Sequence, residues 1–333
     1  MLYRTEKIAE RIGLEMMTEK QRFLAALQRK PVEGHVPTFE LVFFLTMEAF
    51  GKVHPTHRTF GQWWQMSEKE RELQRIDVAD LYIDIARKYG HSCIFYQEFR
   101  SELEDTIRTL QLIKERSNDE FFVVMHGDPT FAMPDGQHMV EESALYFEHP
   151  EKMHERAEQN MKFFIDRAEK LKKANVIDGF CLCSDYCFNT APFFSPAMFS
   201  EFVAPYLKRI CDEYRSMGFM SIKHTDGNIM PILDQLVQCG PDALHSLDPQ
   251  GGVSLKEVKR LYGDKVALCG NVNCGLLQTG TNEEAVADVR RSLQEGMDGW
   301  GYIFCTSNCV YTGLSLERYE MMMDIWKKEG IYK

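Results

Sequence analysis

A histidine and an aspartate, His224 and Asp226, stand two residues apart in the segment SIKHTDGNIM (221–230). Side chains at this spacing on an extended segment point to the same face. They could give two ligands to one divalent cation, and Cys309 could give a third, because Zn²⁺ accepts His, Cys and carboxylate ligands and a catalytic zinc keeps one position open. A structural interpretation is equally open: Asp226 could cap a helix that starts near Ile229, and Cys309 could be a small buried apolar residue.

Other polar side chains also follow apolar runs and are candidates for the same site. We expect Asp185 to take part in catalysis together with His224 and Asp226, because positioned acids and imidazoles move protons. We expect a further group to contact substrate: Glu40, His126, Asn189, His245, Asn271 and Asn308. Polar residues also gather at strand ends because loops are hydrated and helices need caps. The evidence for an active site is therefore the number of such groups at one end of the predicted strands, and no single residue is sufficient.

The apolar runs predict eight strands that are buried on both faces, since they are short and rich in β-forming residues. Helical patterns alternate with these runs; the clearest covers 195–217, where Ser195 suits an N-cap and Pro196 the first turn. Such alternation favours a (β/α)₈ TIM barrel with its active site at the C-terminal ends of the strands. An open doubly wound sheet is the alternative, but residues 40–50 lack its glycine-rich motif. The predicted strands cover 35–44, 92–98, 121–129, 178–186, 219–227, 242–249, 265–273 and 301–309.

We expect one domain overall, with a helical extension at 1–34 that caps the barrel bottom or packs on its side, followed by the barrel at 35–333. The formal net charge of −11 disfavours nucleic-acid binding. No apolar run reaches the roughly 20 residues of a membrane span, and the charged N-terminal stretch lacks a signal-peptide core. The ten cysteines are expected to be reduced thiols. These features predict a cytoplasmic protein, either a monomer or a homodimer.

Several motifs in the C-terminal half follow one another in a familiar order. They are SDYCFNTAPFFSPAMFSEFVAPYLKRI, KHTDGNIMPILDQL, GPDALHSLDP and GYIFCTSNCVYTG, all between residues 184 and 313. In these motifs the chain resembles the uroporphyrinogen decarboxylase-like superfamily. The resemblance implies a (β/α)₈ barrel with a deep cleft at its C-terminal face.

The resemblance allows two chemistries. True uroporphyrinogen decarboxylases bind their polycarboxylate substrate through an arginine-rich segment near the N-terminus, and the matching stretch HVPTFELVFFLTMEAFGKVHP has no Arg. The chain is more similar to the corrinoid-dependent methyltransferases, in which His-x-Cys and a later Cys hold zinc. The matching residues here are His224, Asp226 and Cys309, so that one Cys is replaced by Asp, which favours a harder metal.

The expected function is zinc-dependent transfer of a methyl group between a small methylated substrate and a corrinoid. The substrate could be a methyl ether, such as a methoxylated aromatic in an O-demethylation, or a methylamine. No D-x-H-x-x-G segment occurs, so the corrinoid must be carried by a partner protein. One alternative is a metal-independent decarboxylase acting on a tetrapyrrole or another carboxylated substrate. Another is a non-catalytic binding protein whose mouth is blocked by Phe193, Phe194 and Trp side chains.

Overall fold

The computed structural model describes residues 17–58, 60–100 and 102–332. Seven parallel strands form one curled sheet in which each strand pairs with the next in chain order. The strands are β1 (Cys93–Tyr96), β2 (Phe122–His126), β3 (Gly179–Cys183), β4 (Met220–His224), β5 (Ala243–His245), β6 (Ala267–Cys269) and β7 (Tyr302–Ile303).

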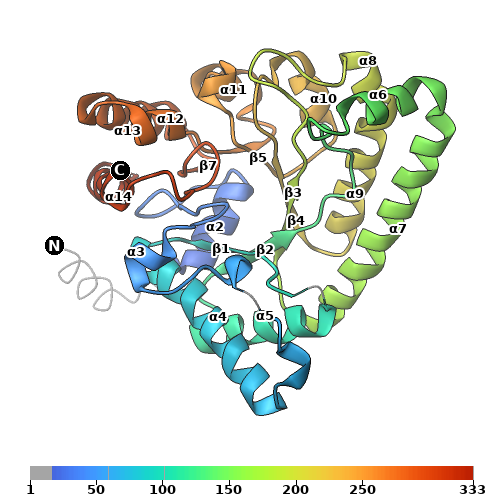
Figure 1. Ribbon diagram of the computed structural model, residues 1–333. Coiled ribbons are helices and arrows are strands. Elements are labelled where there is room, and N and C mark those ends of the chain that lie inside the picture. The colour runs from blue at the N-terminus through green and yellow to red at the C-terminus, as the bar shows by residue number, and fades with distance from the viewer. Residues whose placement is uncertain (1–16, 59, 101, 333) are drawn as a thin grey trace.

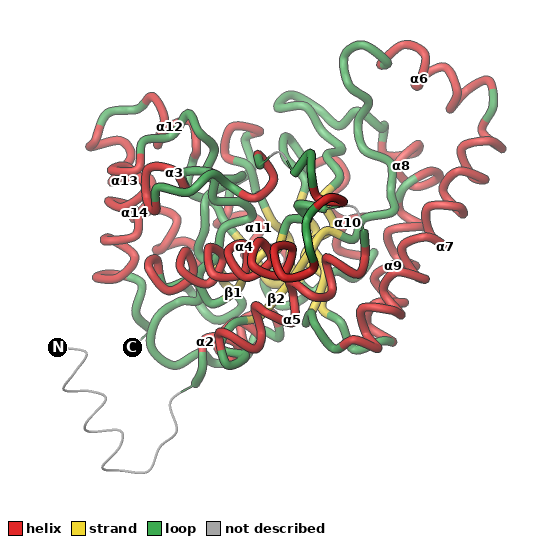
Figure 2. Tube along the Cα trace, turned by 60° about the horizontal axis from the view of Figure 1, so that its bottom comes forward, coloured by secondary structure: helices red, strands yellow, loops and turns green. Residues whose placement is uncertain are grey.

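Helices surround the sheet and make the crossover connections between its strands (Figures 1 and 2). They are α2 (Glu19–Leu27), α3 (Thr46–Phe50), α4 (Glu68–Tyr89), α5 (Leu103–Ser117), α6 (Met139–Glu148), α7 (Pro150–Ala174), α8 (Pro196–Phe202), α9 (Ala204–Ser216), α10 (Leu233–Gln238), α11 (Leu255–Tyr262), α12 (Cys274–Thr279), α13 (Asn282–Gly296) and α14 (Leu316–Glu329). Short 3₁₀ turns lie at Pro55–His57, Trp63–Gln65, Met230–Ile232 and Pro249–Gly251. The arrangement is the α/β, TIM-like architecture that the sequence pattern predicts. The helix predicted over 195–217 is broken at Val203, just before Pro205, which cannot donate a helical hydrogen bond.

The strand predicted over 35–44 does not form as a regular strand. Thr38 and Phe43 make only isolated parallel bridges, to Phe304 and Val310. On the other side, the Ser92 N–H donates to the Thr38 carbonyl at 2.7 Å. Pro37 has no N–H with which to extend a ladder in this segment. The segment therefore links the first and last strands of the sheet through single bridges, and the eighth strand of a complete barrel is absent from the described part of the chain.

The predicted helical extension at 1–34 is described only in part, because residues 1–16 lie outside the described residues. Helix α2 begins with a capping box formed by Thr18 and Gln21. It packs against β1, β2 and β7. Its fully buried Phe23 ring lies 5.1 Å from the ring of Phe122 and 5.5 Å from that of Phe39. Figure 2 shows α2 below the strands. Because Phe23 packs on Phe122 at the start of β2, α2 covers the N-terminal ends of the strands, opposite the end that the polar candidates follow.

The strand register places the inward-facing side chains in layers. In one layer Cys183, His224, His245 and Cys269 stand opposite one another on β3 to β6. The layer below is small and apolar, and includes Cys181, Ile222, Ala243 and Ala267. All ten cysteines are free thiols, as expected. The two histidines are therefore the last inward residues of their strands, where an apolar interior gives way to a polar mouth.

In the described residues, no helix is long and apolar enough to cross a membrane.

We predict that Phe23→Ala lowers the free energy of unfolding by about 3–5 kcal/mol, because it opens a cavity beneath the barrel interior. Phe163→Ala is the matched control, since that side chain is 58% exposed, and it should have little effect. Chemical denaturation of both variants measures the difference. Equal stabilities of the two variants would contradict the role given to α2.

Candidate functional site

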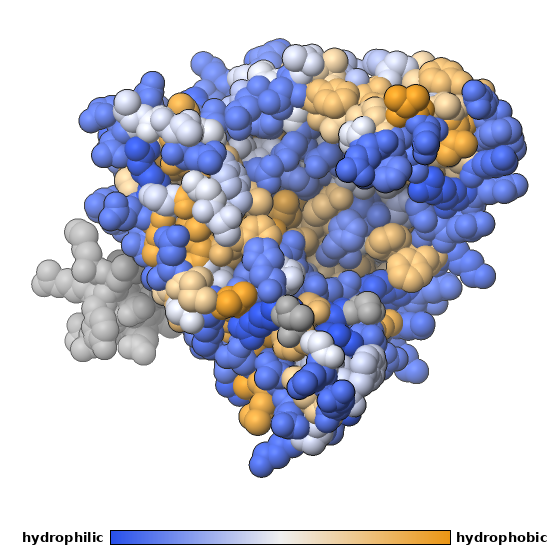
Figure 3. Space-filling view, viewed as in Figure 1, coloured by the Kyte–Doolittle hydropathy of each residue, from blue (hydrophilic) through white to orange (hydrophobic). Residues whose placement is uncertain are grey.

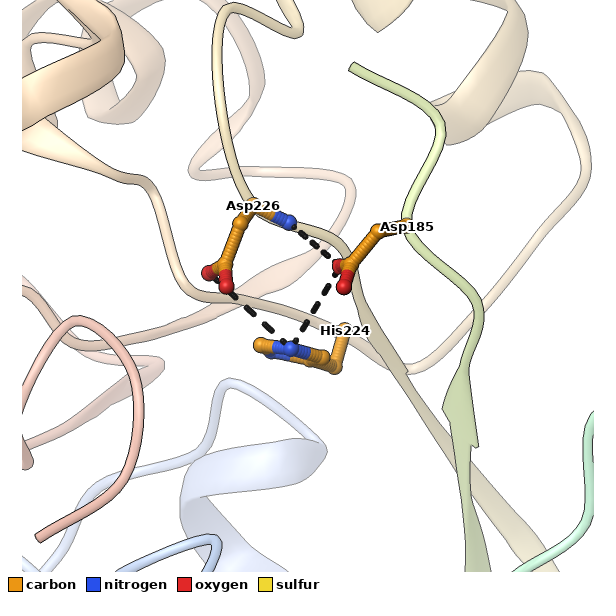
Figure 4. A group of neighbouring side chains, drawn as sticks. All are labelled: Asp185, His224 and Asp226. Atoms are coloured by element: carbon orange, nitrogen blue, oxygen red, sulfur yellow. Dashed lines mark hydrogen bonds and ion pairs between the residues drawn. The ribbon is translucent and has the colours of Figure 1, made fainter. Parts of the chain in front are cut away.

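Three side chains meet at the C-terminal end of β3 and β4. Asp185, His224 and Asp226 place one ligand atom each within 4.8 Å of one another. The Nε2 atom of His224 lies 3.7 Å from Oδ1 of Asp185 and 3.9 Å from Oδ1 of Asp226. Figure 4 shows the imidazole edge facing the two carboxyl groups. An imidazole nitrogen and two carboxylate oxygens form a donor set suited to a divalent cation.

The loops after β3 and β4 are fastened together, which explains why Asp185 reaches Asp226. The N–H of Asp226 donates to Oδ1 of Asp185 at 2.9 Å. The next residue, Gly227, has a φ of +80°, and a Cβ there would lie 2.6 Å from the carbonyl oxygens of Cys187 and Phe188. Only glycine tolerates both this backbone conformation and this close approach. The glycine after Asp226 is therefore required by the close packing of the two loops and not only by the turn.

Burial makes the cluster electrostatically unusual. It raises the pKa of Asp226 to about 7, and the nearby Asp185 charge acts in the same direction. Burial also lowers the pKa of His224 to about 4, so that its imidazole is neutral at physiological pH. The Oδ1 atom of Asp226 is buried without a hydrogen-bond partner. Such an atom is costly unless something pairs with it, and a cation between the three side chains would do so.

Residues from two further strand ends support the cluster. The Nδ2 amide of Asn308, after β7, donates to Oδ2 of Asp226. The Nδ1 atoms of His224 and His245 lie 2.8 Å apart, within hydrogen-bond distance. Asn308 and His245 were predicted to contact substrate, but their contacts here are to the cluster itself.

Two members of the cluster, Asp185 and His224, line a cleft of about 340 Å³. Figure 3 shows this face of the molecule hollowed near its centre, with hydrophobic and hydrophilic side chains both around the hollow. No Arg or Lys occurs among the described residues that line it. The lining residues are Leu41, Val42, Thr56, Phe95, Tyr96, Gln97, Glu98, His126, Cys183, Asp185 and His224.

The remaining predicted site residues lie in different surroundings. His126 is exposed and lines the cleft, and its contact with substrate stays a prediction. Asn189 is exposed on the loop after β3. Asn271 is fully buried, and its amide donates to the Leu247 carbonyl while its side-chain oxygen accepts from Arg291. Its polar groups are therefore engaged away from the cleft.

Cys309 and Glu40 lie beside the cluster but outside it. Cys309 is not in the three-residue group, and burial raises its pKa to about 12. Glu40 accepts from the hydroxyl of Thr306 at 2.5 Å and borders a separate internal cavity of about 20 Å³. Burial raises the pKa of Glu40 to about 8. The Thr306 hydroxyl also lies 3.3 Å from the Asn308 carbonyl, so Glu40 fixes the loop that carries Asn308.

A buried ion pair behind the cluster was missed by the sequence analysis. Lys223 and Asp128 are both fully buried, with 2.7 Å between Nζ and Oδ2. The Lys223 ammonium also donates to the carbonyls of Leu182 and Ser184, just before Asp185. Lys223 stood in the sequence as the one charge inside the apolar run FMSIKH. That signal could have indicated a buried partner, because a lysine is almost never fully buried unless it is paired.

We predict that Lys223→Ala lowers the free energy of unfolding by about 3–5 kcal/mol, because it leaves Asp128 buried and unpaired. Asp128→Leu combined with Lys223→Met should cost less than either partner's removal alone, because it removes both charges. Thermal denaturation of the single and double variants distinguishes the cases. Strictly additive losses would contradict a direct pair.

We predict that Glu40 makes folding pH-dependent. Its pKa rises from an ordinary 4.5 to about 8 in the folded protein, so the folded state binds the proton more tightly. The stabilisation from this proton is complete below pH about 4.5 and is lost as the pH rises towards 8. Glu40→Gln should remove this part of the slope, costing little at acidic pH and stabilising the protein relative to wild type near pH 8. Urea denaturation from pH 5 to 8 measures the free energy of unfolding of both proteins. The same pH dependence in wild type and Glu40→Gln would contradict the assignment.

Comparison with known proteins places the chain in a family. The family model described as "Uroporphyrinogen decarboxylase (URO-D)" matches residues 131–329. No curated protein matches the sequence. Among solved structures, a methyltransferase from Methanosarcina mazei is similar with a TM-score of 0.70 and 17% identity, over 95% of this chain and 99% of that chain. A GH5_18 from Bifidobacterium longum subsp. infantis has a TM-score of 0.49 and 12% identity, over 91% and 80% of the two chains.

At these identities the structural likeness establishes the fold alone. The family model, in contrast, spans more than half of the chain and includes Asp185, His224, Asp226 and Asn308. The chain therefore belongs to the uroporphyrinogen decarboxylase (URO-D) family.

Proposed function

We propose that this URO-D-family protein is a metal-dependent methyltransferase that moves a methyl group between a small methylated substrate and a corrinoid carried by a partner protein. The observation that carries the proposal is the cluster of His224, Asp185 and Asp226, in which one buried carboxylate oxygen of Asp226 lacks a partner. His224 and Asp185 of this cluster line a cleft. The fold shared with a Methanosarcina mazei methyltransferase supports it.

The metal would be held by His224 and Asp226, as expected from the sequence, and by Asp185 in place of Cys309. These three residues fit a cation because a neutral imidazole and two carboxylates stand together while one carboxylate oxygen lacks a partner. The donor set suits Zn²⁺, although two oxygens also accept harder divalent ions. A bound divalent ion supplies Lewis-acid polarisation of the substrate heteroatom. Occupation requires Asp226 to lose its proton, and because burial raises the pKa of this carboxyl to about 7, a proton competes with the cation at neutral and more strongly at acidic pH.

The chain's own residues would orient the substrate and manage its proton. Leu41, Val42 and Phe95 give the cleft an apolar wall that fits a small methylated molecule. The exposed His126 is placed to hydrogen-bond a polar substituent. Asp185, the most accessible acid of the cluster with a side chain 47% exposed, is the group best placed to exchange a proton with the leaving heteroatom.

The charge of the cleft weighs against the decarboxylase alternative. A substrate with many carboxylates needs basic partners, and the described residues lining the cleft include Glu98 and Asp185 but no Arg or Lys. Nor do Phe193 and Phe194 block the cleft, as they would in the non-catalytic alternative. Phe194 is fully buried, with its ring 5.3 Å from that of Tyr146, and neither Phe193 nor Phe194 lines the cleft.

We predict that the purified protein binds about one divalent metal ion per chain, measured by elemental analysis after incubation with Zn²⁺ and desalting. Removing one ligand from such a site should abolish stoichiometric binding, so His224→Ala, Asp226→Asn and Asp185→Asn should each lose the ion. Cys309→Ala is the matched control and should keep it. Loss in Cys309→Ala with retention in Asp185→Asn would restore the ligand set expected from the sequence.

The function itself is tested by methyl transfer. We predict that the metal-loaded protein methylates cob(I)alamin from a methoxylated aromatic or a methylamine. The absorbance change of the corrinoid measures the reaction, and His224→Ala should be inactive. Turnover of a carboxylated substrate by the metal-free protein, without methyl transfer from any donor, would overturn the proposal.

A further inference from the structure

The His224–His245 pair lies in the interior of the barrel. The two residues stand directly opposite each other on neighbouring strands β4 and β5. Their side chains face inward in the same layer, and both residues are at least 95% buried. Their Nδ1 atoms are 2.8 Å apart. Between two neutral imidazoles, this distance requires that one Nδ1 carries a proton and donates it while the other accepts.

The donor can be either histidine, and the two cases differ at Nε2. A neutral imidazole carries one proton, so a His224 that accepts at Nδ1 carries its proton on Nε2, facing the two carboxyl groups of the cluster. A His224 that donates from Nδ1 has a free lone pair on Nε2. Only this second form can bind a cation, because a ligating nitrogen must be unprotonated.

The surroundings of His245 favour the first form in the cation-free protein. Its Nε2 atom is buried without a hydrogen-bond partner. An orphaned N–H is rarer in proteins than an orphaned acceptor, so the imidazole of His245 carries its proton on Nδ1 and donates to His224. The Nε2–H of His224 then faces the carboxylates at 3.7 and 3.9 Å, which is electrostatically favourable.

We propose that His245 is a positioning residue whose tautomer is linked to cation binding at the neighbouring cluster. Occupation of the cluster makes His224 the donor and His245 the acceptor. One proton leaves Nε2 of His224 for solvent, the proton between the rings moves from His245 to His224, and one proton is taken up at Nε2 of His245. The number of protons on the pair does not change.

This inference rests on the proposed metal site, but it makes a separate claim about a residue that does not touch the ion. Ligating histidines ordinarily donate their second N–H to a carboxylate, a carbonyl or water. Here the acceptor is an imidazole that must itself change tautomer. The pair therefore opposes cation binding slightly, while a side chain at 245 that can accept the hydrogen bond without changing its protonation would not.

Nuclear magnetic resonance of ¹⁵N-histidine-labelled protein tests the tautomers directly. Spectra are recorded for the full chain without metal and after titration with Zn²⁺, and the two rings are assigned with single variants. We expect Nδ1 of His224 to change from an acceptor-type to a donor-type nitrogen on Zn²⁺ binding, with the opposite change at Nδ1 of His245. A ring of His245 whose nitrogens do not change when Zn²⁺ binds would overturn the proposal.

Variants at 245 supply an independent readout through Zn²⁺ affinity, measured against a competing chelator. His245→Leu removes the acceptor and should weaken binding by about 10- to 100-fold. His245→Asn can place an amide oxygen where Nδ1 lies and should bind Zn²⁺ at least as tightly as wild type. The exposed His138→Leu controls for loss of a histidine. Equal weakening in the Leu and Asn variants, with folding intact by circular dichroism, would mean that residue 245 acts only through packing.

The outcomes separate the two claims. Absence of Zn²⁺ binding by the wild-type protein would overturn the proposed metal-dependent function, and this inference with it. Binding by wild type that is unchanged in His245→Leu would overturn the inference alone.

Discussion

The candidate site depends on holding two carboxyl groups and a buried imidazole within 4.8 Å of one another. Burial disfavours the charged form of Asp226, and the nearby charge of Asp185 repels it, which is why the pKa of Asp226 rises to about 7. The arrangement persists because neighbouring groups support it: the Asp226 N–H holds Asp185, and Asn308 holds Asp226. A bound cation would offset the repulsion between the two carboxylates.

The supporting groups come from the ends of several strands, so the site depends on the curled sheet as a whole. Asp185 follows β3, Asp226 follows β4, His245 ends β5 and Asn308 follows β7. Beneath them the interior is filled by apolar side chains, and α2 covers the opposite end. The buried Lys223 donates to two backbone carbonyls at the end of β3. The ion pair that holds Lys223 in place therefore also positions the backbone just before Asp185. Stability and site geometry are therefore coupled in the same few residues.

Several site predictions could be made from residue types and spacing, while others required contacts that the sequence does not contain. The pairing of His224 with Asp226 follows from alternation along one strand, which is local information. The expected partner Cys309 lies outside the group, and Asp185 stands in it, because the crossing of two loops at Gly227 decides which side chain arrives there. The place of Asn271 after a strand predicts a site residue, but its amide donates to the Leu247 carbonyl. The pairing of Lys223 with Asp128 does not follow from local spacing, because the two residues are 95 positions apart.

The sequence by itself determined the alternation of strands and helices, the end of the sheet at which polar residues gather, and the family, because these follow from periodicity and from motifs in chain order. It did not determine that the segment 35–44 would pair through single bridges, since pairing depends on how far the ends of the curled sheet are apart. Nor did it determine which three side chains form the cluster or that His224 and His245 lie within hydrogen-bond distance. Those depend on angstrom-scale distances between residues remote in sequence, and only the packed tertiary structure fixes such distances.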